Sequence, residues 1–202
     1  EAREVFQEVD NTLNCGLSKI IFEGPEDDLT YTPNTQPALM AVSIAIVRVI
    51  ENKLKTKISD FADIILGHSL GEYSALCSAG VISLNETTSL LRTRGKAMQN
   101  SVRDIETKMT AVIGLEVFKI EEILNQHKLS ENEVCEIAND NCPGQIILSG
   151  TKSGVEFISE KLKKAGARNL IDLKVSAPFH CKLMKDASIV MKNSLEPINF
   201  NT

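Results

Sequence analysis

Apolar positions recur with the helical period of about 3.6 residues through the first part of the chain. Residues 5–13 carry an apolar stripe that predicts a first helix, and residues 37–53 are apolar on almost every side. Such a segment is typical of a helix packed into the core. The polar stretch 23–35 contains a Gly-Pro pair and a further proline, so we expect a loop there.

The next segments predict a strand, a sharp turn and a helix with no spare residues between them. We expect a short buried strand over 61–66, a turn over 67–71 and a helix over 72–79. A Ser-x-x-Glu capping box at 83–86 opens another helix, which is expected to run to about Asn100.

Beyond Thr107 the pattern changes to the order β-α-β-β-α-β. The expected strands cover 109–115, 134–139, 145–149 and the stretch from 167 to 175. A helix is expected over 119–127, and a Ser153/Glu156 capping box is expected to open the second one. This order predicts a ferredoxin-like α+β subdomain over 107–173. It is inserted between residues 1–106 and 174–202, which we expect to form an incomplete α/β main domain, hydrolase-like, with a parallel-sheet core and a nucleophile elbow.

Composition excludes several classes of protein. The chain has 202 residues, 43% hydrophobic and 24% charged, as expected for a soluble globular domain. A net charge of −5 provides no basic field for a nucleic acid. The longest strongly apolar stretch, 38–47, is about half the ~20 residues needed to cross a membrane, so we expect no membrane association. Five cysteines without C-x-x-C spacing predict neither a disulfide framework nor a zinc site, and favour a reducing compartment.

Residues 67–71 read Gly-His-Ser-Leu-Gly, a G-x-S-x-G sequence. Between a strand and a helix, this pattern predicts a serine nucleophile, Ser69, held on a strained turn. The N–H of Leu70 and the N-terminus of the following helix would then stabilise an oxyanion. The alternative is an ordinary tight turn.

A serine nucleophile needs a base, and the chain has three histidines. His68 adjoins Ser69 but is expected to point elsewhere, and His127 is expected to be a solvated surface residue. His180 lies in a loop after a strand end, where catalytic residues are common. It is either the base or a structural capping residue.

Arg94 falls between Leu91 and Met98 on the apolar face of its helix. Arg92 and Lys96 fall on the opposite, solvated face. A buried guanidinium needs a partner, because an unpaired buried charge is strongly destabilising. Its planar fork suits a carboxylate. Either a structural ion pair or an anionic ligand would satisfy it.

Several motifs together resemble the malonyl-CoA:acyl carrier protein transacylase family, the acyltransferases of fatty-acid synthesis and their relatives in polyketide synthases. They occur in the family's order and at its distances, and they lie at 35–39, 67–75, 94–95 with 98–99, 139–150 and 176–180. The resemblance covers nearly the whole chain and is far more specific than G-x-S-x-G alone.

The resemblance implies that Ser69 is acylated and that His180 is its base. It implies that the Leu70 N–H forms part of the oxyanion hole and that Arg94 binds the free carboxylate of the malonyl group. Phe179, immediately before His180, is similar to the residue that malonyl-selective members carry at this position. Side chains expected near the pocket are Gln36, Met98 and Asn141.

The implied reaction takes malonyl from malonyl-CoA to the phosphopantetheine thiol of acyl carrier protein, without a metal or redox cofactor. One alternative is a serine hydrolase such as a thioesterase or lipase, which has no use for a cation in its acyl pocket. Another is a non-catalytic fragment or docking module. We expect a monomer in the cytoplasm, with an organelle matrix as the alternative.

Two parts of the family pattern lie outside these residues. One is the N-terminal strand with a Gly-Gln-Gly-Ser-Gln motif, which contributes a second oxyanion donor. The other is a C-terminal section whose backbone carbonyl orients the histidine. We therefore expect the chain to be a segment of a longer protein and assign the function to that protein.

Overall fold

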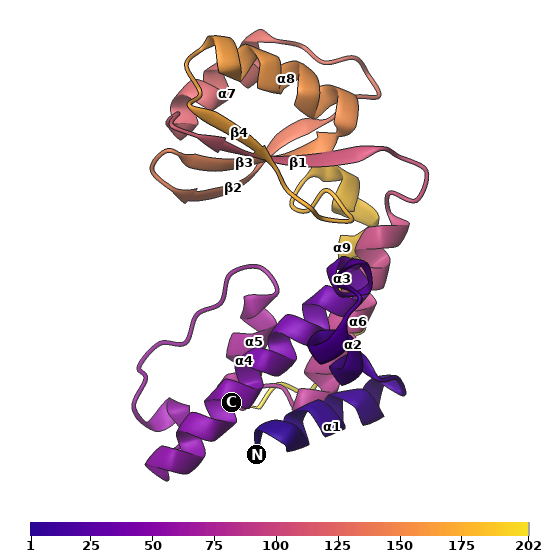
Figure 1. The fold of residues 1–202 in the computed structure, drawn as a ribbon, viewed down its shortest axis with the longest axis vertical. Helices are drawn as coiled ribbons and strands as arrows, with labels where there is room; N and C mark the ends of the chain where they lie inside the picture. Colours follow the sequence, from indigo (N-terminus) through magenta and orange to yellow (C-terminus); the bar gives the residue numbers. More distant parts are fainter. Residues whose placement is uncertain (202) are drawn as a thin grey trace. The chain divides into compact units, whose positions relative to one another are not determined.

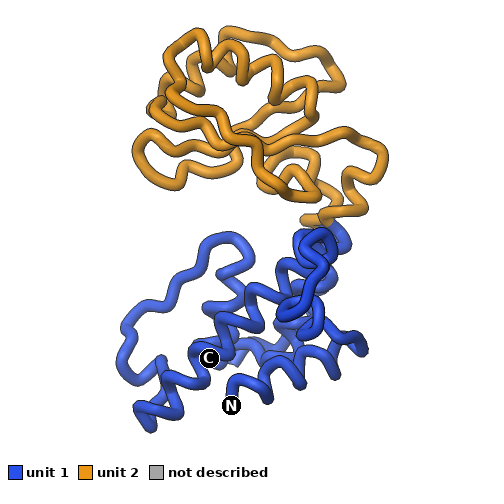
Figure 2. Tube along the Cα trace, viewed as in Figure 1, with its two compact units in different colours: residues 1–97, 189–202 blue, residues 98–188 orange. Residues whose placement is uncertain are grey.

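The computed structural model describes residues 1–201, which divide into two compact units (Figure 2). The first comprises Glu1–Ala97 and the C-terminal residues from Ile189 onward, and the second comprises Met98–Ser188. The subdomain expected over 107–173 lies within the second unit.

The first unit is built from helices (Figure 1). They are α1 Ala2–Leu13, α2 Leu17–Glu23, α3 Glu26–Thr30, α4 Thr32–Leu54, the 3₁₀ helix η1 Ile58–Asp60, α5 Gly71–Ser78 and α6 Leu84–Asn100, the last of which continues into the second unit. The loop expected over 23–35 is wrong, because α3 and the first turn of α4 lie there. Pro33 occupies that first turn, where the N–H that proline lacks would have no helical partner.

The core of the first unit forms where α1 packs on α4. Val5 and Val9 of α1 are 0% and 1% exposed, and they share one apolar cluster with Met40 and Ala41 of α4. This burial confirms the first helix expected from the apolar stripe over 5–13.

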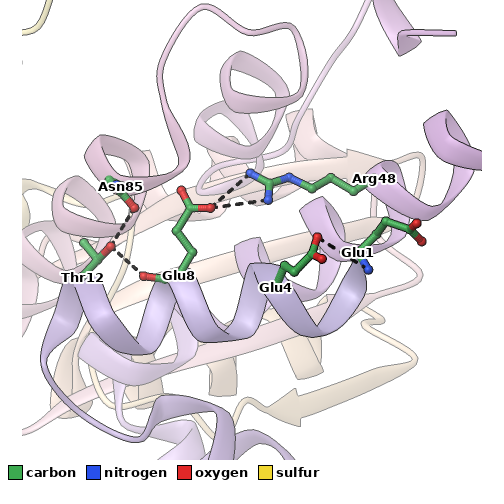
Figure 3. Close-up of polar contacts among 6 residues, drawn as sticks. All are labelled: Glu1, Glu4, Glu8, Thr12, Arg48 and Asn85. Atoms are coloured by element: carbon green, nitrogen blue, oxygen red, sulfur yellow. Dashed lines mark hydrogen bonds and ion pairs between the residues drawn. The ribbon is translucent and has the colours of Figure 1, made fainter.

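Polar contacts lie along another side of α1. Arg48 of α4 pairs with Glu8 at 3.4 Å, and the Thr12 hydroxyl lies 2.8 Å from Oδ1 of Asn85 in α6 (Figure 3). These contacts connect α1 to two other helices of its unit.

The strand expected over 61–66 is wrong for the described residues. Phe61, Ile64 and Leu66 are 53%, 74% and 86% exposed, and the segment has no regular structure. A strand is stabilised by hydrogen bonds to a neighbouring strand. Residues 1–97 and 189–201 contain no other strand to provide them.

The second unit contains a small antiparallel sheet, so the chain as a whole is an α/β protein. Its elements are β1 Thr107–Ile113, α7 Val117–Gln126, β2 Cys135–Cys142, β3 Gln145–Thr151, α8 Lys152–Lys164 and β4 Asn169–Asp172. The strand order is β2-β3-β1-β4, and every neighbouring pair is antiparallel. Helices α7 and α8 lie on one face of this sheet (Figure 1).

Side chains alternate between the two faces of the sheet. Val112 and Leu148 belong to the cluster beneath α7 and α8, whereas Met109, Ala111 and Ile147 form a second cluster. This alternation follows from the two-residue period of a strand.

One of the two expected capping boxes is confirmed. The Ser83 N–H donates to Glu86 Oε2 at 3.1 Å, and the Glu86 N–H donates to Ser83 Oγ at 3.2 Å. The second box is wrong, because the cap of α8 is Thr151, whose hydroxyl accepts the Gly154 N–H at 3.3 Å. Thr151 lies deeper than Ser153 and is 7% exposed.

After β4 the chain forms the 3₁₀ helix η2 Lys182–Met184 and helix α9 Lys185–Leu195, the latter part of which belongs to the first unit. Met191 packs there against Ile82, and the Asn201 N–H donates to the Val81 carbonyl at 3.0 Å. None of the helices in residues 1–201 is both long and apolar enough to cross a membrane.

The role of Thr151 is tested by Thr151→Val, which removes the hydroxyl and keeps the branched shape. The hydroxyl also accepts the buried Val134 N–H at 3.0 Å, so we expect a loss of about 1–2 kcal/mol in the free energy of unfolding. Ser153→Ala should change it by less than ~0.5 kcal/mol. Urea unfolding of both variants measures the difference, and an equal loss in the two would contradict the assigned cap.

Candidate active site

Ser69 lies on a turn with unusual backbone geometry. Its φ is +54°, in the left-handed region that a residue with a side chain seldom adopts. A Cβ built on Gly67 would lie 1.8 Å from the Gly71 carbonyl oxygen, whereas one on Gly71 would meet nothing within 4 Å in the described chain. The turn therefore requires glycine at position 67, where the backbone crosses close to the start of α5.

Helix α5 begins directly after this turn. The Gly71 N–H donates to the His68 carbonyl at 2.9 Å and the Glu72 N–H donates to the Ser69 carbonyl at 3.1 Å. The N–H of Leu70, the N-cap residue, forms no such bond with any of residues 1–201. A helix N-terminus with a spare N–H favours a negatively charged oxygen.

Arg94 is the cation beside Ser69. Its Nη2 donates to Ser69 Oγ at 3.2 Å and its Nη1 donates to Gln36 Oε1 at 2.6 Å. Its guanidinium carbon lies 5.9 Å from the centre of the Tyr73 ring. No carboxylate within residues 1–201 forms an ion pair with it, so the structural ion pair that the sequence allows is not formed there.

The Arg94 side chain is partly buried from solvent. Burial lowers the pKa of Arg94 from its ordinary value, and Tyr73 and Glu72 oppose that change. Burial likewise raises the pKa of the Tyr73 phenol, against the opposing charge of Arg94. Arginine nevertheless stays protonated near neutral pH. The site therefore holds a positive charge close to a serine hydroxyl, with uncharged groups as its direct partners.

Gly95 brings Arg94 and Gln36 together. A Cβ at Gly95 would lie 2.6 Å from the Pro33 Cα and 2.8 Å from the Thr32 carbonyl oxygen. Helix α6 therefore touches the backbone of the first turn of α4, which is followed by Gln36, a side chain 3% exposed. The sequence signal was a glycine inside a helix, next to a charged residue on its apolar face.

The neighbours of Arg94 on α6 differ from each other. Lys96 is exposed, as expected, but Arg92 is half-buried, which corrects its assignment to the solvated face. Arg92 donates to the Asn34 side chain and, through Nη2, to Cys15 Sγ at 3.4 Å. These two contacts connect α6 to α4 and to the segment between α1 and α2.

The other expected site residues belong to the second unit. His180 is exposed in the loop before η2 and has a φ of +57°. Met98, one turn beyond Arg94 on α6, is 8% exposed, and Asn141 is exposed near the end of β2. Gln36, Ser69 and Arg94 thus lie together in the first unit, whereas His180 and Asn141 belong to the second unit.

Of the other two histidines, His68 is exposed. His127 is half-buried rather than fully solvated, because its Nδ1 lies 3.0 Å from the Ile123 carbonyl and its ring lies on edge to Phe157.

Three cysteines, two of them buried and one half-buried, are poor nucleophiles. Burial raises the pKa of Cys135 to about 12 and also raises the pKa values of Cys77 and Cys181, so all three remain thiols near neutral pH. In the described part of the chain, no group of three or more His, Cys, Asp or Glu side chains is placed to hold a metal ion.

The chain is similar to known proteins over nearly its whole length. The family described as the acyl transferase domain matches residues 1–202. A malonyl CoA-acyl carrier protein transacylase of Bacillus subtilis is 41% identical over 195 residues, which are 96% of this chain and 60% of that protein. The corresponding protein of Haemophilus influenzae is 40% identical over 98% of this chain and 62% of its own length.

Solved structures show the same likeness. The crystal structure of an acyl-carrier-protein-S-malonyltransferase from Bartonella henselae has a TM-score of 0.92 and 50% identity, covering 99% of this chain and 63% of that chain. A malonyl-transacylase solved in complex with its type II polyketide acyl-carrier protein has a TM-score of 0.89 and 37% identity. That match covers 99% of this chain and 63% of the transacylase chain. The chain therefore spans about three fifths of the length of these relatives.

The contact between α6 and α4 is tested by Gly95→Ala. The new methyl group meets backbone atoms that cannot swing aside, so we expect a loss of about 1–3 kcal/mol in the free energy of unfolding, although alanine is the better helix former. Gly71→Ala, where the described chain leaves open space, is the matched control and should change stability by less than ~1 kcal/mol. Denaturant unfolding of both variants gives the comparison, and a neutral Gly95→Ala would show that this contact is loose.

Proposed function

The chain belongs to the acyl transferase domain family, and we propose that the complete protein transfers malonyl from malonyl-CoA to the phosphopantetheine thiol of acyl carrier protein in fatty-acid biosynthesis. One observation carries the proposal: the Arg94 guanidinium, without a carboxylate partner within residues 1–201, donates to the hydroxyl of Ser69. A nucleophile beside a cation is what a substrate with both a thioester and a free carboxylate requires.

In the first half-reaction, Ser69 Oγ attacks the thioester carbonyl of malonyl-CoA while His180 takes the hydroxyl proton. The negative charge that develops on the carbonyl oxygen is stabilised by the Leu70 N–H and the N-terminus of α5. The carbon–sulfur bond then breaks, and CoA leaves as a thiol with the proton from His180. Ser69 now carries the malonyl group as an ester.

In the second half-reaction, the phosphopantetheine thiol of the carrier protein attacks the ester. His180 accepts the thiol proton and returns it to Ser69 Oγ as the ester bond breaks. The products are malonyl-carrier protein and the free serine hydroxyl. Each proton removed by the base is returned, so both half-reactions balance without an oxidant or a reductant.

Arg94 selects the acyl group in this proposal. Its two terminal nitrogens, which contact Ser69 and Gln36 in the structure, would turn to the malonyl carboxylate as a bidentate pair. The bound carboxylate replaces uncharged partners with a charged one. A hydrolase of uncharged acyl chains gains nothing from this cation, so Arg94 favours transfer of malonyl over the thioesterase or lipase alternative.

We also propose a hydrolase-like parallel sheet for the first unit of the complete protein. The exposed side chains Leu39, Ile46 and Leu54 of α4 would pack on it. For residues 107–173, the order β-α-β-β-α-β and the sheet order β2-β3-β1-β4 support a ferredoxin-like subdomain. A monomer in the cytoplasm stays a prediction.

The nucleophile is tested by Ser69→Ala in the full-length protein. After incubation with malonyl-CoA, the wild type should show a stable malonyl mass increment and the variant none, with unchanged thermal unfolding, since one oxygen on a half-buried turn contributes little to packing. Ser188→Ala, an exposed serine on α9, is the control and should acylate normally.

Other outcomes of that experiment favour the alternatives. Turnover of malonyl-CoA without a covalent species would favour a hydrolase, and neither signal in the wild type would favour a docking module. A malonyl increment on Ser69→Ala would move the nucleophile to another residue.

The acyl selectivity is tested by Arg94→Ala. Loss of the charged hydrogen bonds should reduce kcat/KM for malonyl-CoA by the equivalent of about 1.5–3 kcal/mol, roughly ten- to hundredfold, and leave acetyl transfer unchanged or improved. Arg94→Lys keeps the charge but loses the fork and should lie in between. Arg92→Ala, two residues away, is the charge-matched control. Equal losses for malonyl and acetyl would make Arg94 a structural residue.

A further inference from the structure

The loop that carries His180 has a backbone conformation that its surroundings must maintain. The φ of +57° at His180 is disfavoured for a residue with a Cβ, and its side chain is exposed. Contacts of the residues on either side help to maintain this conformation.

The residue before His180 is fixed on the sheet. The Phe179 N–H points to the sulfur of Met109 on β1, with a nitrogen–sulfur distance of 3.3 Å, and the Phe179 ring packs in the cluster of Met109, Ala111 and Ile147. The residue after it, Cys181, is 9% exposed. Both neighbours of the histidine are thus packed against the protein.

A carboxylate fixes the next residue. Glu136 on β2 accepts the Lys182 N–H through Oε2 at 2.8 Å, the length of a charge-assisted hydrogen bond. Lys182 is the first residue of η2, and the Met184 N–H donates to the Cys181 carbonyl at 2.9 Å. Glu136 therefore supplies a charged acceptor at the start of the helical turn that follows His180.

We propose that Glu136 is a positioning residue, whose carboxylate sets the direction of the His180 imidazole by holding the Lys182 N–H. This proposal rests on the proposed function for the role of His180 as base, but the geometry belongs to the chain itself. Without an acceptor at this position, the Lys182 N–H is free to turn to water and the backbone at His180 relaxes toward negative φ. The imidazole then spends less time where it can remove a proton.

The variants are Glu136→Ala, which removes the acceptor, and Glu136→Gln, which keeps an acceptor oxygen but no charge. Glu131→Ala, an exposed carboxylate on the connection before β2, is the control for loss of one negative charge. Single-turnover acylation of the full-length protein by malonyl-CoA is followed by intact mass over a range of substrate concentrations. The NMR signal of the His180 Cε1–H, assigned by its loss in His180→Ala, reports on the imidazole directly.

We expect Glu136→Ala to lower the maximal acylation rate about tenfold, because a small displacement of a catalytic group slows the reaction strongly. The half-saturating malonyl-CoA concentration should stay unchanged, since Glu136 does not bind the acyl group. Glu136→Gln should retain most of the rate, and Glu131→Ala all of it. The His180 signal should shift or broaden in Glu136→Ala and remain single and sharp in Glu136→Gln.

Two results would overturn the proposal: wild-type acylation by Glu136→Ala, or a slowed variant whose His180 signal does not change. Failure of the proposed function is distinct, because the wild type itself would then not acylate. The NMR comparison still decides the role of Glu136 in that case, since an unchanged His180 signal in Glu136→Ala contradicts positioning whatever the reaction.

Discussion

The candidate site depends on the close backbone contact between α6 and the first turn of α4. Because Gly95 has no side chain, α6 reaches Pro33 and Thr32, and this approach places Arg94 beside Gln36. The same guanidinium reaches Ser69 on the turn before α5. The Arg94 side chain thus connects three segments that are distant in sequence. Its position depends on Gly95, because a side chain there would keep α6 away from α4.

The two residues assigned to the chemistry share a backbone feature. Ser69 and His180 both adopt a positive φ, at +54° and +57°, although neither is glycine. Each is held by its surroundings: the first by the turn between Gly67 and α5, the second by contacts to β1 and β2. Strained positions of this kind persist where neighbouring structure over-determines them, and they often coincide with functional sites.

The sequence predicted the elements whose contacts the described residues supply and failed where those contacts were missing or unexpected. Helices α1 and α6 were predicted because periodicity and capping residues act over short distances, and the four strands of the second unit because each one pairs with a neighbour there. The strand over 61–66 failed, since pairing is a property of two segments. The α8 cap was assigned to Ser153 because sequence spacing does not reveal that Thr151 also accepts a hydrogen bond from Val134.

The candidate site shows the same division. Ser69, His180 and Arg94 were predicted from a motif, a loop position and a charge on an apolar face. The partners Gln36 and Tyr73 were harder to assign, because Gln36 contacts Arg94 only through the packing of α4 on α6, and Tyr73 only because α5 presents its ring to the guanidinium. Glu136 had no sequence signal, since a carboxylate that accepts a backbone N–H from another segment resembles any surface residue.

The return of the C-terminal residues to the first unit has a consequence for synthesis on the ribosome. The second unit is continuous and has all its residues once position 188 has emerged, whereas the first begins at the N-terminus and still lacks Met191 and the bond from Asn201 to Val81. Domains generally fold as units while the chain is being made. The later unit in the sequence can therefore complete its fold first, and the residues that carry Ser69 must wait, with part of their apolar surface uncovered, for residues made more than a hundred positions later.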